Sequence, residues 1–145
     1  MPLEGDYEPS PWDWVVEQVR LYESTGGEEG GTLDGAPCVI LTTKGRKSGK
    51  LRKSPLMRIE HDGVFAVVAS MGGAPKHPVW YLNLVANPDV TLQDGGRVLD
   101  LRARTATPGE KRHWWPRLTA VWPAYSEYQS KTERDIPVVL LEPNA

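Results

Sequence analysis

The apolar positions of the chain recur with two different periods, and this pattern separates predicted strands from predicted helices. Short apolar or alternating runs have the length of strands. In one of them Leu99, Leu101 and Ala103 alternate with charged residues, which predicts a strand with one buried face. Another run, Val64 to Ala69, is apolar throughout, which predicts burial on both faces. The strands are expected at residues 38–43, 56–60, 64–69, 90–93, 97–104 and 136–141.

Helical spacing is confined to four segments. Ser10 and Pro11 have the residue types of an N-cap and a first helical position, and Asp13 would complete a capping box. This helix would bury Trp12, Val15, Val16, Val19 and Tyr22 and end near Ser24. Pro78 opens a predicted helix at 79–86, and a second capping box at 107–110 opens a helix that Pro123 ends. A short helical segment carrying Tyr125 and Tyr128 follows.

Three predicted hairpins and a closing strand favour an α+β fold built on an antiparallel meander. The turns are the polar stretch 44–55, the pair Asp62-Gly63 and the triplet 94–96. Such a sheet best removes its open edges by curling into a barrel. The division expected is an acidic leader at 1–35, with an amphipathic helix and a flexible Gly-rich linker, followed by a cofactor-binding domain at 36–145.

The net charge of −2 over 145 residues hides a strong asymmetry. Residues 1–34 hold nine acids and one base, which gives −8, and the remaining 16 bases and 10 acids give +6. An acidic leader packed near a basic site would screen that site from nucleic acid. The leader would also be repelled by anionic lipid, so membrane association is disfavoured. With no long apolar run, the chain is expected to be cytoplasmic.

The positive charge is densest in the predicted turn between the first two strands. Six cations stand there, Lys44, Arg46, Lys47, Lys50, Arg52 and Lys53, and Gly45 and Gly49 allow the backbone to turn tightly. The turn is expected to hold an anionic small molecule, the alternative being a solvated hairpin tip. It is not a P-loop, because three residues separate its glycines and Leu51 follows Lys50.

Residues for direct catalysis are scarce, which favours chemistry carried by a bound cofactor. The single cysteine, Cys38, excludes an internal disulfide, and three scattered histidines indicate no metal site. The glycine-rich loop 70–76 follows a buried strand and leads into a helix, a position suited to an anionic cofactor. Trp122, Tyr125 and Tyr128 would share a helical face and either line a flat acceptor or fill a core.

Several segments together resemble the deazaflavin-dependent nitroreductase family of actinobacteria. They are residues 41–49, 70–78, 80–88, Trp115-Pro116 and 136–139, in the family's order and spacing. The resemblance implies a split β-barrel like that of flavin reductases, with flanking helices. It implies coenzyme F420, a deazaflavin with a phosphodiester and an acidic tail, and hydride transfer to a quinone, an activated enone or a nitroaromatic acceptor.

The resemblance also implies roles for individual residues. Phosphate and tail would be held by Arg46, Lys47, Ser48 and Arg52. The deazaflavin would be approached by Ser54, Pro55, Ala69, Ser70, Met71, Gly72, Gly73, Trp80 and Asn83. The acceptor pocket would be formed by Trp122, Tyr125 and Tyr128, with Ser70, Tyr125 and Tyr128 as the catalytic candidates, Ser70 or Tyr125 serving as the proton donor or hydrogen-bond stabiliser.

Two residues depart from the family pattern. Met71 stands where a lysine is common, which removes or moves one anion contact, and Trp122 replaces a frequent tyrosine, which reshapes the acceptor pocket. Three other functions remain open at this point: an FMN-dependent oxidoreductase of the same barrel type, a non-catalytic F420-binding protein, and a nucleic-acid module suggested by the basic turn alone.

Overall fold

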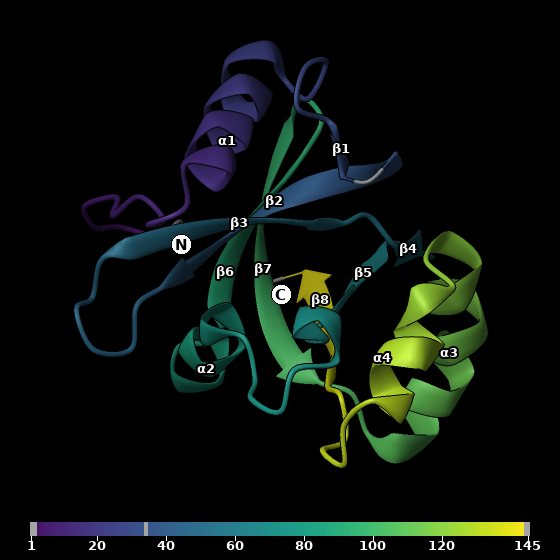
Figure 1. Ribbon diagram of the computed structural model, residues 1–145. Helices are drawn as coiled ribbons and strands as arrows, with labels where there is room; N and C mark the ends of the chain where they lie inside the picture. Colours follow the sequence, from purple (N-terminus) through teal and green to yellow (C-terminus); the bar gives the residue numbers. More distant parts are fainter. Residues whose placement is uncertain (1–2, 34, 144–145) are drawn as a thin grey trace.

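A curled antiparallel sheet with helices on its faces forms the body of the molecule. The computed structural model describes residues 3–33 and 35–143 (Figure 1). The helices are α1 (Asp13–Thr25), α2 (Val79–Ala86), α3 (Pro108–Val121), α4 (Ala124–Ser130) and the 3₁₀ turn η1 (Met71–Gly73). The strands are β1 (Thr32–Leu33), β2 (Ala36–Lys44), β3 (Leu51–Met57), β4 (Glu60–His61), β5 (Val64–Val68), β6 (Asp89–Asp94), β7 (Arg97–Thr105) and β8 (Val138–Pro143).

The strand order shows how the sheet closes on itself. Neighbouring strands run β1-β2-β6-β7-β8-β5-β4, and β3 pairs with β2. Residues 58–59 carry β3 onward into β4: the N–H of Arg58 donates to Pro37 O, and the N–H of Ala66 donates to Ile59 O, both at 2.9 Å. The path therefore returns to its start, which confirms the predicted α+β class and split-barrel architecture, including the flavin-reductase-like curl.

The three predicted hairpins are confirmed, but their arrangement as a meander is wrong. β2 pairs with β6 and β8 lies between β7 and β5, so strands distant in sequence are neighbours. The hairpin at 62–63 is tight because Asp62 and Gly63 both take positive φ, 53° and 80°. Long-range pairing depends on how complementary faces pack, and local turn signals carry no information about it.

The predicted start of the first helix and the predicted burial of Trp12 need correction. The first helix begins at Asp13, and Ser10 is not its N-cap, because the Ser10 hydroxyl accepts the N–H of Trp12 at 3.1 Å in a preceding turn. Trp12 is therefore the extended N-cap residue and is 58% exposed, outside the buried face. By contrast, α2 has its predicted bounds, and the capping box between Thr107 and Glu110 is present.

The barrel strands separate two packed cores. Phe65 and Val67 of β5 belong to the core that α2 covers through Leu84, while Ala66 and Val68 belong to the core beneath α3 and α4. This alternation confirms the prediction of a strand buried on both faces. A smaller cluster anchors α1 on the outer side of β2, with Val15, Val19 and Tyr22 against Cys38 and Ile40. The helices thus surround β3 and the loop after β5, where the candidate site lies.

The Gly-rich segment after α1 is a packed turn rather than the flexible linker expected. Gly26 is left-handed with φ 62°, and the N–H of Gly27 donates to Tyr22 O at 2.9 Å. A Cβ on Gly27 would lie 3.0 Å from the Cα of Gly95, so the segment sits tightly against the β6–β7 turn. This packing fixes the position of α1 over the sheet.

Candidate functional site

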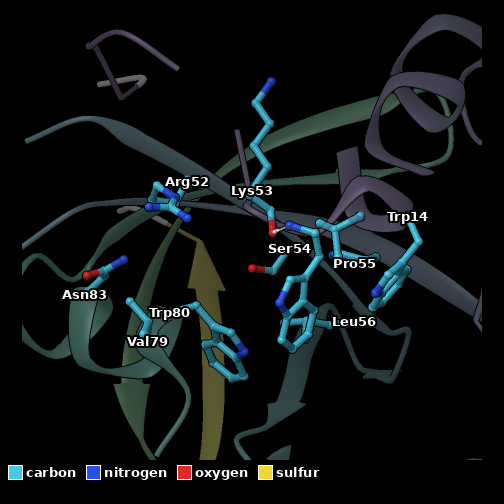
Figure 2. A pocket seen from close by; sticks show the side chains of 12 residues that line it. Trp14, Arg52, Lys53, Ser54, Pro55, Leu56, Val79, Trp80 and Asn83 are labelled. Atoms are coloured by element: carbon cyan, nitrogen blue, oxygen red, sulfur yellow. Dashed lines mark hydrogen bonds between the residues drawn. The ribbon is translucent and has the colours of Figure 1, made fainter. Parts of the chain in front are cut away.

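Two adjoining cavities lie between β3, α2, α4 and the start of α1. The larger has a volume of about 710 Å³ and the smaller about 210 Å³, and both are lined by Arg52, Leu56, Val79 and Trp80. Figure 2 shows the smaller one, with Trp80 and Val79 from α2 facing the β3 residues. The larger cavity is of a size and apolar character suited to a flat ring system, and the smaller extends it toward the basic hairpin.

The structure gathers most of the predicted site residues around these cavities. The lining includes Arg52, Ser54, Pro55, Ser70, Met71, Trp80, Asn83, Trp122, Tyr125 and Tyr128. Arg46, Lys47 and Ser48 lie beyond the lining, in the hairpin turn. Ala69 is fully buried behind the cavity, and Gly72 and Gly73 belong to η1.

Sequence reasoning missed the contribution of the leader to the cavity walls. Ser10, Pro11, Trp12 and Trp14 line the larger cavity, and the rings of Trp12 and Trp14 stack with centroids 6.3 Å apart. Both tryptophans are more than half exposed, at 58% and 53%. Their spacing of two residues does not fit one helical face, and this signal could have assigned at least one of them to a pocket rather than to a core.

The hairpin turn is built by its own backbone and one hydroxyl. The N–H of Gly45 donates to Lys50 O at 2.7 Å, and Gly49, with φ 73°, donates to Gly45 O at 3.0 Å. The Ser48 hydroxyl accepts the N–H of Lys50 at 3.1 Å, so its oxygen shapes the turn itself. Ser48 therefore has a structural contact that its expected role in anion binding did not include.

Asn83 fixes the turn to the cavity. Its Oδ1 accepts the N–H of Arg46 at 3.1 Å, and its Nδ2 donates to the Thr43 hydroxyl at 3.3 Å. The side chain is 98% buried, so the amide is committed to these contacts on the cavity rim. Asn83 thus holds the cationic turn at a set distance from the ring-sized cavity.

The acidic leader neutralises part of the positive charge. It runs along β3, with an isolated parallel bridge between Tyr7 and Leu51, and Glu8 reaches Arg52 at 3.0 Å. Glu23 of α1 forms an ion pair with Lys53. In residues 3–33 and 35–143, Lys44, Arg46, Lys47 and Lys50 form no ion pair with an acidic side chain. The turn itself therefore keeps its positive charge, as an anion site requires.

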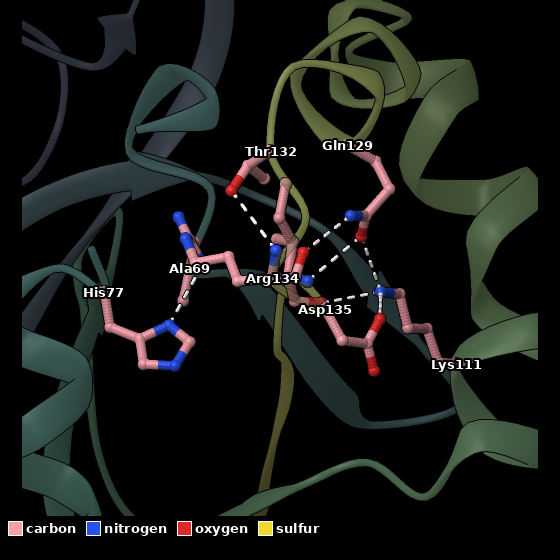
Figure 3. Close-up of polar contacts among 8 residues, drawn as sticks. Ala69, His77, Lys111, Gln129, Thr132, Arg134 and Asp135 are labelled. Atoms are coloured by element: carbon pink, nitrogen blue, oxygen red, sulfur yellow. Dashed lines mark hydrogen bonds and ion pairs between the residues drawn. The ribbon is translucent and has the colours of Figure 1, made fainter. Parts of the chain in front are cut away.

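Ser70 and Met71 are held in place by an arginine that the sequence did not single out. The guanidinium of Arg134 donates to the carbonyl oxygens of Ser70 at 2.7 Å and Ala74 at 2.8 Å. It also donates to that of Ala69 at 3.1 Å, a bond that Figure 3 shows. One of its nitrogens also lies 3.0 Å from His77 Nδ1. Burial and the neighbouring guanidinium lower the pKa of His77, which favours its neutral, accepting form. Nothing in the polar stretch 131–135 marks Arg134 in advance.

The loop also packs closely on α4. Gly73 has φ 82°, and a Cβ there would lie 2.7 Å from the carbonyl oxygen of Tyr128. Met71 also has positive φ, 47°, and is 53% exposed on the cavity wall. Gly73 therefore allows a close approach of two backbones, which ties the loop after β5 to the helix that carries Tyr125 and Tyr128.

Three aromatic side chains from the α3–α4 junction line the far wall of the larger cavity. Trp122 Nε1 donates to the Tyr128 hydroxyl oxygen at 3.3 Å, and the rings of Tyr125 and Tyr128 meet edge to face with centroids 6.3 Å apart. Tyr125 is buried, and burial raises the pKa of its hydroxyl, so this phenol stays protonated at neutral pH. The wall thus offers the protonated Tyr125 hydroxyl beside apolar ring surface.

Two further properties of residues 3–33 and 35–143 bear on other kinds of site. These residues hold no group of three or more His, Cys, Asp or Glu side chains placed to bind a metal ion. Within the same ranges, no helix combines the length and apolar character needed to cross a bilayer.

Comparisons with known proteins identify a family and individual proteins that this chain resembles. Residues 14–143 match the family described as F420H(2)-dependent quinone reductase. F420H(2)-dependent quinone reductase Rv1261c of Mycobacterium tuberculosis (strain ATCC 25618 / H37Rv) is 35% identical over 139 residues, covering 87% of this chain and 90% of that protein. The solved structure of an F420-H2 dependent reductase, FDR-A, is 53% identical with a TM-score of 0.69, covering 73% and 94% of the two chains.

A more distant structure shares the fold. The FAD-binding protein mll6688 of Mesorhizobium loti has a TM-score of 0.53 at 13% identity, over 74% of this chain and 79% of that one. At this identity the likeness shows the barrel architecture alone.

Proposed function

Since the chain belongs to the F420H2-dependent quinone reductase family, we propose that it transfers a hydride from reduced coenzyme F420 to a quinone. One observation carries the proposal: the smaller cavity extends the ring-sized one toward the basic hairpin, and four of the six cations there have no acidic partner in the described ranges. F420 combines a flat ring with a long anionic tail, so its two parts match the two parts of the site.

The residues present fit the cofactor. Trp80 and Leu56 give the ring apolar surface, and Ser54 and Ser70 give polar contacts beside it. Arg52 stands between the cavities and the turn, where a phosphodiester would pass. The tail would be held by the remaining predicted contacts in the turn, Arg46, Lys47 and Ser48. FMN has a phosphate without such a tail, so it would leave the charge of the turn unused.

Bound reduced F420 would supply the hydride, and the protein would supply position and hydrogen bonds. The acceptor would lie between the ring and the wall of Trp122, Tyr125 and Tyr128, out of bulk water. Holding the two reactants in contact removes much of the entropy cost of the reaction. Ser70 or Tyr125 would then donate to the acceptor oxygen, where negative charge develops.

Cofactor binding tests the first half of this proposal. We expect the purified protein to bind F420 more tightly than FMN, with an affinity that falls as salt rises. Joint replacement of Arg46, Lys47 and Arg52 by alanine should weaken F420 binding by at least tenfold. Joint replacement of Arg97 and Arg102 by alanine, on exposed β7, should not. Tight FMN binding without F420 binding would support the FMN-dependent alternative instead.

Turnover tests the second half. We expect F420H2 oxidation with a quinone acceptor, and the same assay with an activated enone and a nitroaromatic tests the other two acceptor classes. Tyr125→Phe and Ser70→Ala should lower turnover much more than F420 affinity. If the protein binds F420 and oxidises F420H2 with none of these acceptors, it is a non-catalytic F420-binding protein.

The partners that we propose are small molecules. The leader carboxylates that neutralise Arg52 and Lys53 weaken the basic surface that nucleic acid would need. The same acidic segment disfavours binding to anionic membranes, and we place the protein in the cytoplasm, with residues 36–145 as the cofactor-binding domain. Salt-sensitive binding to DNA or RNA, or flotation with anionic vesicles, would contradict this view.

A further inference from the structure

We propose that Trp122 is a positioning residue that directs the hydroxyl proton of Tyr128 toward the acceptor. The inference rests on the proposed function, since it takes the acceptor to be a quinone in the larger cavity. It assigns to Trp122 a chemical task through its indole N–H, beyond its bulk as a pocket wall.

The argument starts from the donor and acceptor capacities of the two groups. An indole N–H donates and cannot accept, so in the 3.3 Å contact the Tyr128 oxygen is the acceptor. The phenol proton is then left to donate elsewhere. In the part of the chain that the structure describes, this hydroxyl forms no other hydrogen bond. Tyr128 lines the larger cavity, so a ligand there is the partner available to its proton.

The backbone around the pair is fixed on both sides. Trp122 ends α3, with its N–H donating to Leu118 O at 2.9 Å, and α4 starts two residues later. On the other side, Gly73 of the cofactor loop lies against the carbonyl of Tyr128. The phenol therefore has a set place relative to both the indole and the loop that faces the cofactor, as a donor to a reacting group requires.

The reaction makes use of a donor at this position. Hydride addition breaks one C–H bond of reduced F420 and gives the quinone two electrons and one proton, and the electron pair displaced from the carbonyl π bond rests on oxygen. The deazaflavin that has lost the hydride releases its ring N–H proton, and this proton reaches the reduced quinone through water, which completes the quinol and leaves oxidised F420. A hydrogen bond from Tyr128, in addition to the one proposed above from Ser70 or Tyr125, would stabilise the oxygen as its charge grows. The indole N–H, donating into the same phenol, strengthens that bond through cooperativity.

The kinetic test is a double-mutant cycle with menadione as the quinone. Trp122→Phe keeps an aromatic ring and removes the N–H, and we expect kcat to fall about three- to tenfold with F420 affinity within twofold of wild type. In a Tyr128→Phe background the same change should have no further effect on kcat. An equal loss in both backgrounds would overturn the proposal, because it would show that Trp122 acts without Tyr128.

Trp115→Phe is a matched control. Its indole makes a bond of the same length, 3.3 Å, from α3 to Ser126 of α4, away from the larger cavity. We expect kcat to stay within twofold of wild type. A loss as large as that of Trp122→Phe would show that the α3–α4 junction, rather than the Tyr128 hydroxyl, is what matters.

A spectroscopic test needs no activity. In ¹H–¹⁵N spectra of the cofactor-free protein, the indole resonance absent from Trp122→Phe identifies Trp122. In Tyr128→Phe that resonance should move upfield and exchange faster with water, because its acceptor is gone. An unmoved resonance would overturn the inference whether or not the wild-type protein reduces quinones. Absence of F420 binding or of quinone turnover by the wild type would instead count against the proposed function.

Discussion

Arg134 gives the most demanding test of how the site is held together. Replacing it by alanine removes the guanidinium that bonds the carbonyl oxygens of Ala69, Ser70 and Ala74 and contacts His77. Arg134 is half-buried, and burial lowers the pKa of its guanidinium. The loop that carries Ser70 would lose its main cross-link to the segment after α4.

The magnitude follows from the three carbonyl bonds. A hydrogen bond from a charged group contributes about 1.5–3 kcal/mol when buried, which sets an upper limit of about 5–9 kcal/mol. Water can reach a half-buried side chain and replace part of this, so we expect a loss of about 3 kcal/mol in the free energy of unfolding. For a chain of this size that corresponds to a fall in Tm of about 6–12 °C.

Thermal unfolding of the cofactor-free protein measures the global effect, and hydrogen exchange of residues 69–77 measures the local one. Arg134→Lys should be intermediate, because a single ammonium cannot reach all three carbonyls at once. Arg102→Ala is the control, since its exposed pair with Asp89 contributes little. If Arg134→Ala melts within 2 °C of the wild type and the loop exchanges no faster, the arginine does not hold the loop.

Three further predictions follow from single side chains. An adjacent guanidinium lowers the pKa of Glu110 from 4.5 to about 2, so its stabilisation is present above pH 4.5 and lost as pH falls toward about 2. Glu110→Gln should therefore flatten the dependence of Tm on pH in that window, and an unchanged slope would contradict this. Burial raises the pKa of the Cys38 thiol to about 11, so a disulfide reagent at pH 8 should react slowly with the folded protein and fast in denaturant. Rapid reaction of the folded protein would refute the burial. Gly73→Ala should lower F420 affinity and Tm, because its Cβ meets the Tyr128 carbonyl, whereas Gly63→Ala, with nearly the same φ but open space, should lower Tm slightly and leave affinity unchanged.

Local features of the fold were predictable because local residues decide them. The capping box at 107–110, the proline before α2 and the turn at Asp62-Gly63 each depend on a few adjacent positions. The pairing of β2 with β6 and of β8 with β5 depends on faces formed by residues far apart in the chain. For these long-range pairings the resemblance to a known family predicted the barrel, whereas the turns alone predicted a meander with the wrong strand order.

The candidate site divides in a similar way. The resemblance implied that Ser54, Ser70 and Trp80 approach one ring. The structure places Ser54 on the smaller cavity and Ser70 on the larger, and Trp80 lines both. The resemblance gave no indication that the side-chain oxygens of Asn83 and Ser48 accept hydrogen bonds from the backbone of the hairpin turn. Such contacts are settled by three-dimensional packing, and residue type alone does not reveal them.

The contact between the leader and β3 has a consequence for self-association. β3 pairs with β2 on one side, and a strand left open on its other side is a template for another chain. Main-chain bonds from residues 6–8 to Leu51 cover the start of that edge, and charged side chains follow it. The segment that neutralises part of the charge of the site therefore also blocks the addition of a strand from another molecule at this edge. A substitution in residues 6–8 would therefore change both the tendency of the protein to self-associate and its affinity for the ligand.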